Sequence, residues 1–291
     1  MMKQPRRLKK KMRLKLMTIS EVLNQGVNAL KSNNIENSQN EAIWILEDVL
    51  SCTYSRILFN ESENISSENE KKFFDKINER ISGVPVQYIL GKWEFYGREF
   101  YVGKGVLIPR PETEMLVEYA LEFLKDKKSP IVIDLCAGTG CIGLTVARER
   151  PDSKVYLVEK YDEAFAYLKK NSIGIKNIEL VKADILDKSQ LSMLPKADLV
   201  LSNPPYIETS EISSLQKEVQ LEPVTALDGG NDGLIFYRAI KNILPEICKG
   251  AAAMECGENQ SETISEIFHT KKFLKDFAGI NRVVVYEGEN K

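Results

Sequence analysis

The chain has 291 residues, and its length predicts two domains at about 150 residues each. Hydrophobic residues make up 43% and charged residues 28%, which excludes disordered, fibrous and collagen-like classes of protein. Eight of the 40 basic side chains lie in residues 1–16, where no acidic residue occurs. The rest of the chain therefore has 32 basic and 42 acidic side chains, a net charge of −10. This negative charge predicts no direct binding to duplex DNA.

The basic leader, residues 1–16, is predicted to be disordered or to precede a true start at Met17, where the first helix is expected. No apolar segment follows the leader, so it is not a secretory signal. No run of about 18 apolar residues predicts a membrane span either. These absences predict a cytoplasmic protein.

Residues 17–83 are predicted to form a small N-terminal domain of three or more helices. Ser/Thr-x-x-Glu patterns, typical of a capping box at a helix start, begin at Thr18, Ser38 and Ser67. Apolar residues then recur every three or four positions, which gives each helix one face to bury. Residues 84–108 are predicted to be a linker with a β-hairpin centred on Gly97.

Residues 109–291 are predicted to form an α/β domain. After a helix around residues 115–123, short apolar strands alternate with helical stretches. This alternation predicts a Rossmann-like fold, a doubly wound and mostly parallel sheet with helices on both faces. The strands are expected at residues 131–135, 155–158, 178–181, 198–202, 250–254 and 282–286.

A glycine-rich turn follows the first of these strands. Gly138, Gly140 and Gly143 satisfy G-x-G-x-x-G, in which glycine lets the backbone approach a ligand at a helix N-terminus. Glu159 ends the next strand, where a carboxylate can accept two hydrogen bonds from a ribose diol. Together these features predict a nucleoside-containing cofactor, without deciding which one.

NAD and S-adenosylmethionine are the two candidate cofactors. An NAD enzyme needs a proton donor, and Tyr156 and Lys160 have the spacing of a Tyr/Lys pair. Their place in a predicted strand favours a packing role instead. The motif after a later strand then favours S-adenosylmethionine.

That motif is Asn203-Pro204-Pro205-Tyr206, directly after the strand at 198–202. The prolines fix the backbone, so that the nearby carbonyl groups point in defined directions. The Asn203 side chain and the Pro204 carbonyl can accept the two N–H bonds of a planar amino group, while the Tyr206 ring packs on its π system. Its place at the carboxyl end of a strand predicts a binding site rather than a plain turn.

The chain from Met17 onward resembles one family. Asn-Pro-Pro-Tyr is typical of S-adenosylmethionine-dependent methyltransferases that act on amide or exocyclic amino nitrogens. Four further runs are similar to those of the peptide chain release factor glutamine methyltransferases, the PrmC/HemK group: Pro85–Gly91, Glu94–Gly97, Leu107–Glu114 and Glu222–Leu234.

This resemblance implies a protein-(glutamine-N5) methyltransferase. Its substrate would be the glutamine of the Gly-Gly-Gln motif in release factors, with S-adenosyl-L-methionine as methyl donor and S-adenosyl-L-homocysteine as product. The N-terminal helical domain would bind the release factor. We expect release factors as partners, and neither a membrane nor a metal ion.

The resemblance also implies roles for particular residues. Glu159 would hold the cofactor ribose, and Asp184 with Ile185 would border the adenine. The methionine portion would be lined by Cys136, Ala137, Gly138, Thr139 and Gly140. The glutamine would be held by Asn203, Pro204, Pro205 and Tyr206, with Asn203, Pro204 and Tyr206 as catalytic residues and Asn203 also beside the cofactor. Many family members have Gly in place of Cys136 and Asp in place of Glu159, which predicts a slightly tighter cofactor pocket.

Other interpretations stay open. The same motif serves methylases of exocyclic amino groups in nucleic acid, a ribosomal-protein glutamine is a further possible substrate, and the chain could be a noncatalytic nucleotide-binding module. Arg110 either guides a ligand or forms an ion pair with Glu112 or Glu114. Five scattered cysteines without a C-x-x-C pair predict reduced thiols and no metal site, and the single histidine, His269, is expected to be a surface or packing residue.

Overall fold

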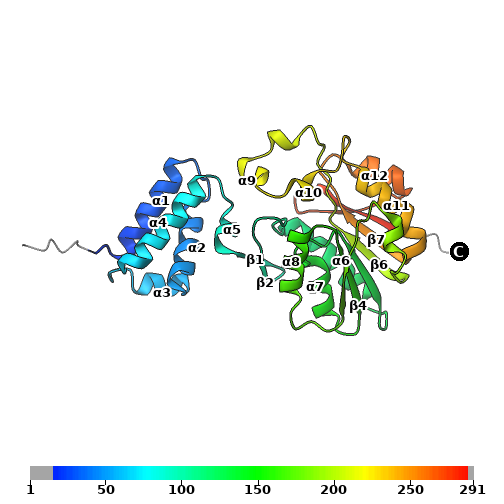
Figure 1. The fold of residues 1–291 in the computed structure, drawn as a ribbon, viewed down its shortest axis with the longest axis horizontal. Coiled ribbons are helices and arrows are strands. Elements are labelled where there is room, and N and C mark those ends of the chain that lie inside the picture. The colour runs from blue at the N-terminus through cyan, green and yellow to red at the C-terminus, as the bar shows by residue number, and fades with distance from the viewer. Residues whose placement is uncertain (1–15, 288–291) are drawn as a thin grey trace, which may run out of the picture. The chain divides into compact units, whose positions relative to one another are not determined.

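The computed structural model describes residues 16–287, and the predicted leader lies outside them except for its last residue. The chain divides into two compact units between Leu90 and Gly91 (Figure 1). The division therefore lies later than the predicted end of the helical domain at residue 83, and the hairpin belongs to the second unit rather than to a linker.

The first unit is helical throughout its described part. Its helices pack their apolar faces around a core that includes Val22, Leu46 and Phe73. The helices are α1 (Ile19–Ser32), α2 (Ser38–Leu50), α3 (Tyr54–Phe59), α4 (Ser67–Ile81) and α5 (Val86–Leu90).

Only one of the three predicted capping boxes forms. The Thr18 hydroxyl oxygen accepts a hydrogen bond from the Glu21 backbone N–H, and the Glu21 carboxylate accepts one from the Thr18 backbone N–H. The prediction at Ser38 is wrong, because this residue already lies in the helix and Glu41 turns inward to Arg80, with 2.5 Å between Oε2 and Nε. Helix α4 is capped by Ser66 and not by Ser67, where the predicted pattern begins. The Ser66 hydroxyl accepts the Asn69 backbone N–H.

The second unit begins with the predicted hairpin, β1 (Lys92–Phe95) and β2 (Arg98–Tyr101), which pair antiparallel. Tyr96 and Gly97 in its turn have φ of +52° and +67°, the left-handed values that a tight two-residue turn requires. Phe95 and Phe100 place their rings edge to face in the core of this unit.

A seven-stranded sheet forms the centre of the described part of this unit. Its order is β5-β4-β3-β6-β7-β9-β8; the first five strands pair in parallel, and β9 is antiparallel to both of its neighbours, β7 and β8. The predicted doubly wound, mostly parallel sheet is thus confirmed, although β8 was not predicted. The strands are β3 (Ile131–Leu135), β4 (Lys154–Glu159), β5 (Ile178–Lys182), β6 (Ala197–Ser202), β7 (Cys248–Glu255), β8 (Lys272–Lys275) and β9 (Asn281–Glu287).

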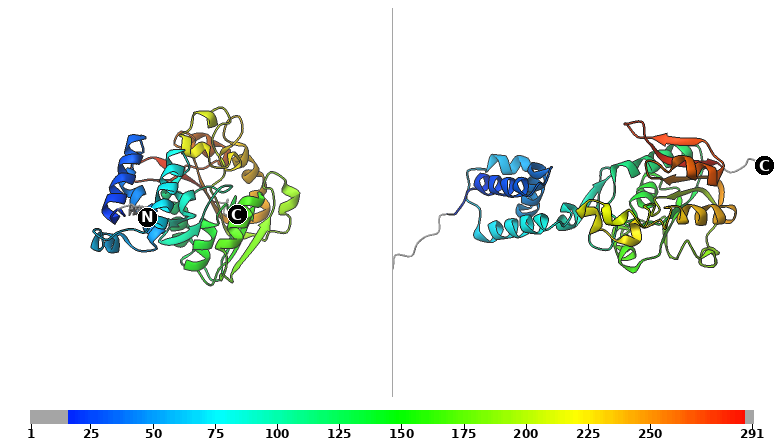
Figure 2. Two further views of the ribbon diagram at one scale, coloured as in Figure 1. Left: turned by 60° about the vertical axis from the view of Figure 1, so that its left-hand side comes forward. Right: turned by 90° about the horizontal axis from the view of Figure 1, so that it is seen from above.

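Alternate strand residues face two separate cores. Val132, Leu157 and Leu201 pack with helices α6 to α8, whereas Ile133, Val158 and Val200 pack with α11 and α12 on the other face (Figures 1 and 2). This period of two is what a strand buried on both faces requires. The helices and 3₁₀ turns are η1 (Pro111–Thr113), α6 (Glu114–Leu124), α7 (Cys141–Glu149), α8 (Asp162–Asn171), η2 (Lys188–Leu191), η3 (Ile212–Ser214), α9 (Lys217–Gln220), α10 (Val224–Leu227), α11 (Ile235–Ile247) and α12 (Ser261–Phe268).

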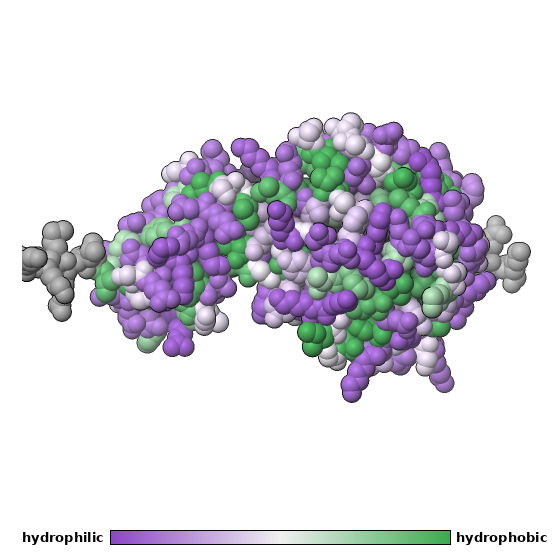
Figure 3. Space-filling model, viewed as in Figure 1, coloured by the Kyte–Doolittle hydropathy of each residue, from purple (hydrophilic) through white to green (hydrophobic). Residues whose placement is uncertain are grey.

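The surface is polar with separate apolar patches on the face that Figure 3 shows. Large exposed apolar side chains such as Phe59, Met193 and Phe277 lie far apart in the sequence, at the end of α3 and in two loops. Within residues 16–287, no helix has the length and apolar character needed to cross a bilayer.

Candidate active site

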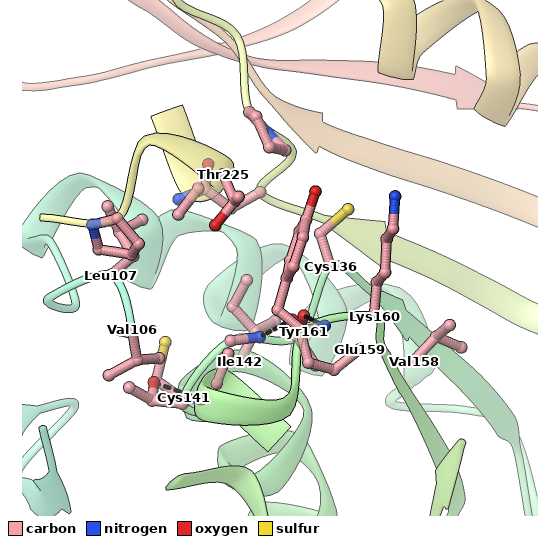
Figure 4. A pocket seen from close by; sticks show the side chains of 18 of the residues that line it. Val106, Leu107, Cys136, Cys141, Ile142, Val158, Glu159, Lys160, Tyr161 and Thr225 are labelled. Carbon is pink, nitrogen blue, oxygen red and sulfur yellow. Dashed lines mark hydrogen bonds between the residues drawn. The ribbon is translucent and has the colours of Figure 1, made fainter. Parts of the chain in front are cut away.

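A cavity of about 840 Å³, which includes space open to solvent, lies where β3, β4, β5 and β6 end (Figure 4). The carboxyl ends of parallel strands meet at one edge of a sheet, so motifs far apart in the sequence come together here. The predicted site residues that line it are Cys136, Ala137, Gly138, Thr139, Glu159, Asp184, Ile185, Asn203 and Pro205.

The glycine-rich turn after β3 borders the floor of this cavity. Cys136, Gly138 and Gly140 all have positive φ, between +56° and +81°. A Cβ at Gly138 would meet only the Val106 side chain, at 3.8 Å, so this glycine faces open space. A Cβ at Gly140 would lie 2.5 Å from Leu168 Cδ1, so Gly140 serves packing and does not line the cavity as predicted.

The Asp134 side chain holds the glycine-rich turn in place through a hydrogen bond. Its Oδ2 accepts the Gly143 N–H at 2.9 Å, which ties the end of β3 to the first turn of α7. A Cβ at Gly143 would lie within 2.9 Å of the same oxygen, so only glycine allows this close packing. Burial raises the pKa of the Asp134 carboxyl to about 7.

Glu159 connects the ends of β3 and β4. It is buried, its Oε2 accepts the Gly138 N–H at 2.9 Å, and its Oε1 accepts the Tyr161 N–H at 2.8 Å. A carboxylate has about four acceptor positions, so hydroxyl groups of a ligand can still donate to it. Figure 4 shows this side chain beside Lys160 and Tyr161, at one end of the cavity.

Asp184 lies across from Lys160, with 2.8 Å between Oδ2 and Nζ. The hydrogen bond that the Lys160 ammonium donates to Asp184 raises the pKa of Lys160. Ile185 is buried and contributes apolar surface, as does Val158 from β4. A charged rim and an apolar interior thus share this part of the cavity.

The opposite wall comes from segments that the sequence reasoning did not assign to the site. Val106 and Leu107 precede η1, and Thr225 lies in α10 (Figure 4). Phe236 adds an aromatic ring from α11. Leu107 and Thr225 lie in two of the runs that resemble the family, but those runs predicted no role at the cavity, and only the fold brings these residues to the strand ends.

Arg110 pairs with Glu222, not with Glu112 or Glu114 as we considered. The Glu222 carboxylate is almost fully buried and also accepts the Ile108 N–H at 3.0 Å. Glu114 instead accepts the Tyr96 N–H at 2.8 Å. The Arg110–Glu222 pair therefore anchors the wall of the cavity that contains residues 105–110.

Asn203 follows β6 directly and reaches the cavity, as does Pro205. The Asn203 Nδ2 donates to Thr113 Oγ1 at 3.1 Å. Pro204 and Tyr206 are not among the lining residues; Tyr206 instead borders a neighbouring polar pocket and accepts a hydrogen bond from Gln260 at its carbonyl oxygen. Burial raises the pKa of the Tyr206 phenol, which keeps the phenol protonated near neutral pH.

Of the competing pair Tyr156 and Lys160, only Lys160 lines this cavity. Tyr156 is absent from its lining, and the Lys154 ammonium lies 5.5 Å from its ring centroid. His269 is an exposed residue at the end of α12. The cysteines are free thiols, and residues 16–287 hold no cluster of side chains suited to a metal ion.

Comparisons with known proteins agree with this division of the chain. A family model described as PrmC N-terminal domain matches residues 21–91, and one described as Methyltransferase small domain matches residues 113–230. The release factor glutamine methyltransferase of Clostridium acetobutylicum is 36% identical over 92% of this chain and 98% of its own length. This chain belongs to the release factor glutamine methyltransferase family.

Other relatives and solved structures agree with this assignment. Release factor glutamine methyltransferases of Fusobacterium nucleatum and Clostridium botulinum are 34% and 35% identical, over 91% and 92% of this chain and 77% and 98% of their own lengths. The fold is similar to the hMettl16 catalytic domain, solved in complex with MAT2A 3′UTR hairpin 6, with a TM-score of 0.52, 16% identity and coverage of 73% of this chain and 81% of that one. The Rossmann-like methyltransferase fold is thus confirmed, and the chain is a methyltransferase.

Proposed function

We propose that this methyltransferase transfers a methyl group from S-adenosyl-L-methionine to the side-chain amide nitrogen of the glutamine in the Gly-Gly-Gln motif of peptide chain release factors. The observation that carries the proposal is that Asn203 and the glycine-rich turn line one cavity. The site for a planar amide and the site for a nucleoside-containing cofactor are therefore neighbours. The curated relatives, named release factor glutamine methyltransferases, support this substrate.

The lining residues suit S-adenosyl-L-methionine. The space above Gly138, which a Cβ would enter, lies beside the Glu159 carboxylate that would hold the ribose hydroxyls. Apolar surface from Val158 and Ile185 would accept the adenine, next to Asp184. Residues 136–139 would bind the methionine portion. When bound, the cofactor supplies an electrophilic methyl group on a sulfonium.

The protein's task is to present a poor nucleophile. An amide nitrogen shares its lone pair with the carbonyl group, so it must be held with that lone pair toward the methyl carbon. We propose that Asn203 Oδ1, on the motif residue that lines the cavity, accepts one of its N–H bonds, with the Pro204 carbonyl next along the chain as the second acceptor. Correct alignment at about 3–3.5 Å contributes several kcal/mol to such a reaction. The amide proton is then lost to solvent.

The helical unit is proposed to bind the release factor. It has its own core and matches a separate family model, so it forms a structural module of its own. Since release factors work on ribosomes, we place the enzyme in the cytoplasm. The net charge of −10 over residues 17–291 speaks against nucleic acid as the substrate.

The test is incubation of the purified chain with isotopically labelled S-adenosyl-L-methionine and a release factor. We expect label in the wild-type release factor and none when the glutamine of Gly-Gly-Gln is replaced by alanine. Parallel reactions with ribosomal proteins and with RNA test the competing substrates. Label in RNA alone, or equal labelling of the two release factors, would overturn the proposal.

A further inference from the structure

A chain of three polar side chains, Asn203 and the buried Thr113 and Glu255, leads away from the proposed substrate site. Thr113, at the end of η1, donates its hydroxyl hydrogen to Glu255 Oε2 at 2.6 Å. The same hydroxyl oxygen accepts the Asn203 Nδ2 hydrogen bond at 3.1 Å. Thr113 is 2% and Glu255 3% exposed, so solvent does not compete for these groups.

The direction of these hydrogen bonds follows from chemistry. An ionised carboxylate only accepts, so it takes the single hydrogen of the threonine hydroxyl. The Thr113 oxygen can then only accept from Asn203, which requires the NH₂ end of the carboxamide to face it. The Asn203 oxygen is consequently the end that remains for a ligand.

We infer that Thr113 and Glu255 are positioning residues, which hold the Asn203 carboxamide with its oxygen toward the substrate amide. This inference rests on the proposed function, in which Asn203 accepts a substrate N–H bond. Glu255 itself is well fixed, because it ends β7 and its backbone carbonyl accepts the Tyr237 hydroxyl at 2.7 Å. Three separate elements, η1, β7 and α11, therefore fix the rotamer of the Asn203 side chain.

The protonation state of Glu255 controls this orientation. Burial, together with the smaller effect of the Glu112 charge, raises its pKa to about 7, although hydrogen bonds from Thr113 and Asn203 and the charge of Arg282 lower it. A protonated carboxyl can donate to Thr113, whose hydroxyl can then donate to Asn203 Oδ1 and turn the carboxamide around. Turnover should therefore fall as the pH drops below about 7.

Other titratable groups near Glu255 do not produce the same effect. Burial raises the pKa of the neighbouring tyrosines and thiols, so they stay neutral near pH 7. Arg282 is paired with Asp276 at 2.8 Å. Among the described residues, the titratable or charged side chains that face Glu255 are Glu112, Cys141, Tyr206, Tyr237, Cys256 and Arg282.

The experiment compares Thr113→Val, Thr113→Ser and Glu255→Gln in the full chain. Valine keeps the shape of threonine without its hydroxyl, and serine keeps the hydroxyl. We expect Thr113→Val and Glu255→Gln to lower kcat about 10- to 100-fold, because the carboxamide is no longer held in one orientation. Thr113→Ser should stay within about threefold of wild type, and all three should bind S-adenosyl-L-methionine within about threefold of wild type by calorimetry.

A control and a direct readout separate positioning from general damage. Asp198→Asn removes a carboxylate at the opposite end of β6, where it accepts the Ile131 N–H, and should leave kcat unchanged. In protein labelled with ¹⁵N-asparagine, the NMR signals of the Asn203 side-chain amide are identified as those missing from the Asn203→Ala variant. They should shift in Thr113→Val and titrate near pH 7 in wild type but not in Glu255→Gln.

The outcomes are distinct. Unshifted Asn203 signals and near-normal kcat in Thr113→Val would overturn the inference, as would equal loss of kcat in Thr113→Val and Thr113→Ser. If Glu255→Gln does not fold, the two Thr113 variants still decide. If wild type labels no release factor, the proposed function fails, while the Asn203 signals still test the orientation.

Discussion

Cys136 occupies a backbone position that glycine fills more easily. Its φ of +60° is left-handed, a conformation that costs a residue with a Cβ about 1–2 kcal/mol. Burial also raises the pKa of its thiol well above the usual range, so the side chain is not a reactive nucleophile. Cys136 therefore adopts the left-handed conformation of this turn at a modest energetic cost, and its thiol borders the cavity.

This strain predicts how substitutions at Cys136 behave. Cys136→Gly should change the free energy of unfolding by less than about 1 kcal/mol, because relief of strain offsets the greater flexibility of the unfolded chain. Cys136→Val should lower it by about 2 kcal/mol, since a β-branched side chain fits this conformation worst. Urea unfolding measures both, and a valine variant as stable as the glycine variant would contradict the assigned backbone strain.

The Asp134 carboxyl predicts a pH-dependent stability. Its pKa rises from 3.8 in the unfolded chain to about 7 in the fold, so between these values the folded state binds more protons and its stability falls as pH increases. Asp134→Asn cannot ionise and lacks this loss. From pH 5 to pH 8, the free energy of unfolding of wild type should fall relative to the variant by about 2–3 kcal/mol.

Urea unfolding of both proteins across this range is the measurement. Glu255 titrates in both proteins, so its contribution cancels in the difference. A difference that stays constant with pH would show that Asp134 ionises normally in the fold.

At the scale of elements, sequence patterns predicted what depends on local chemistry. The strands β3 to β7 and β9 were predicted because their apolar runs pack on both faces of the sheet. Strand β8 was missed because it has only four residues, and its two apolar ones lie between lysines. The capping box at Thr18 was predictable for the same local reason, since both partners lie within one turn.

Features that depend on distant partners were not predictable in this way. Arg110 and Glu222 are 112 positions apart, and nothing near Arg110 reveals its partner. The motif residues of the cavity were found, but Val106, Leu107 and Thr225 were not, because their role comes only from the path of the chain. Sequence patterns thus predicted one side of the site and the fold supplied the other.

Glu41 shows how burial overrides a capping pattern, and it predicts an energetic effect between α2 and α4. Its pair with Arg80 is buried, with side chains 10% and 5% exposed. Glu41→Ala should lower the free energy of unfolding of the helical unit by about 3 kcal/mol, because the buried guanidinium loses this carboxylate. Glu41→Leu combined with Arg80→Met should recover most of that loss.

The measurement is urea unfolding followed by circular dichroism. An exposed pair in α4, Lys71 with Asp75, provides the control, and Asp75→Ala should change stability by less than about 0.5 kcal/mol. A double variant no more stable than Glu41→Ala would show that the destabilisation does not arise from the lost charge pair.

For the whole molecule, the two units are expected to divide cofactor binding from recognition of the protein substrate. Every residue that lines the cavity lies between Gly105 and Phe236, within the second unit, which also has both of its own cores. A chain of residues 91–291 should therefore fold and bind S-adenosyl-L-methionine within about threefold of the full chain by calorimetry. Its kcat/KM for an intact release factor should fall at least about 100-fold, because remote contacts with the substrate no longer contribute to the transition state.

A short peptide that contains only Gly-Gly-Gln is the matched control for this truncation. Such a peptide reaches the cavity without the contacts that we assign to the helical unit, so both chains should methylate it at equal, low rates. The two substrates together locate the effect: loss with the intact release factor alone means lost recognition, whereas loss with both means a damaged catalytic unit. If the shortened chain methylates the intact release factor as well as the full chain does, the helical unit has no role in binding it, and its buried core serves stability alone.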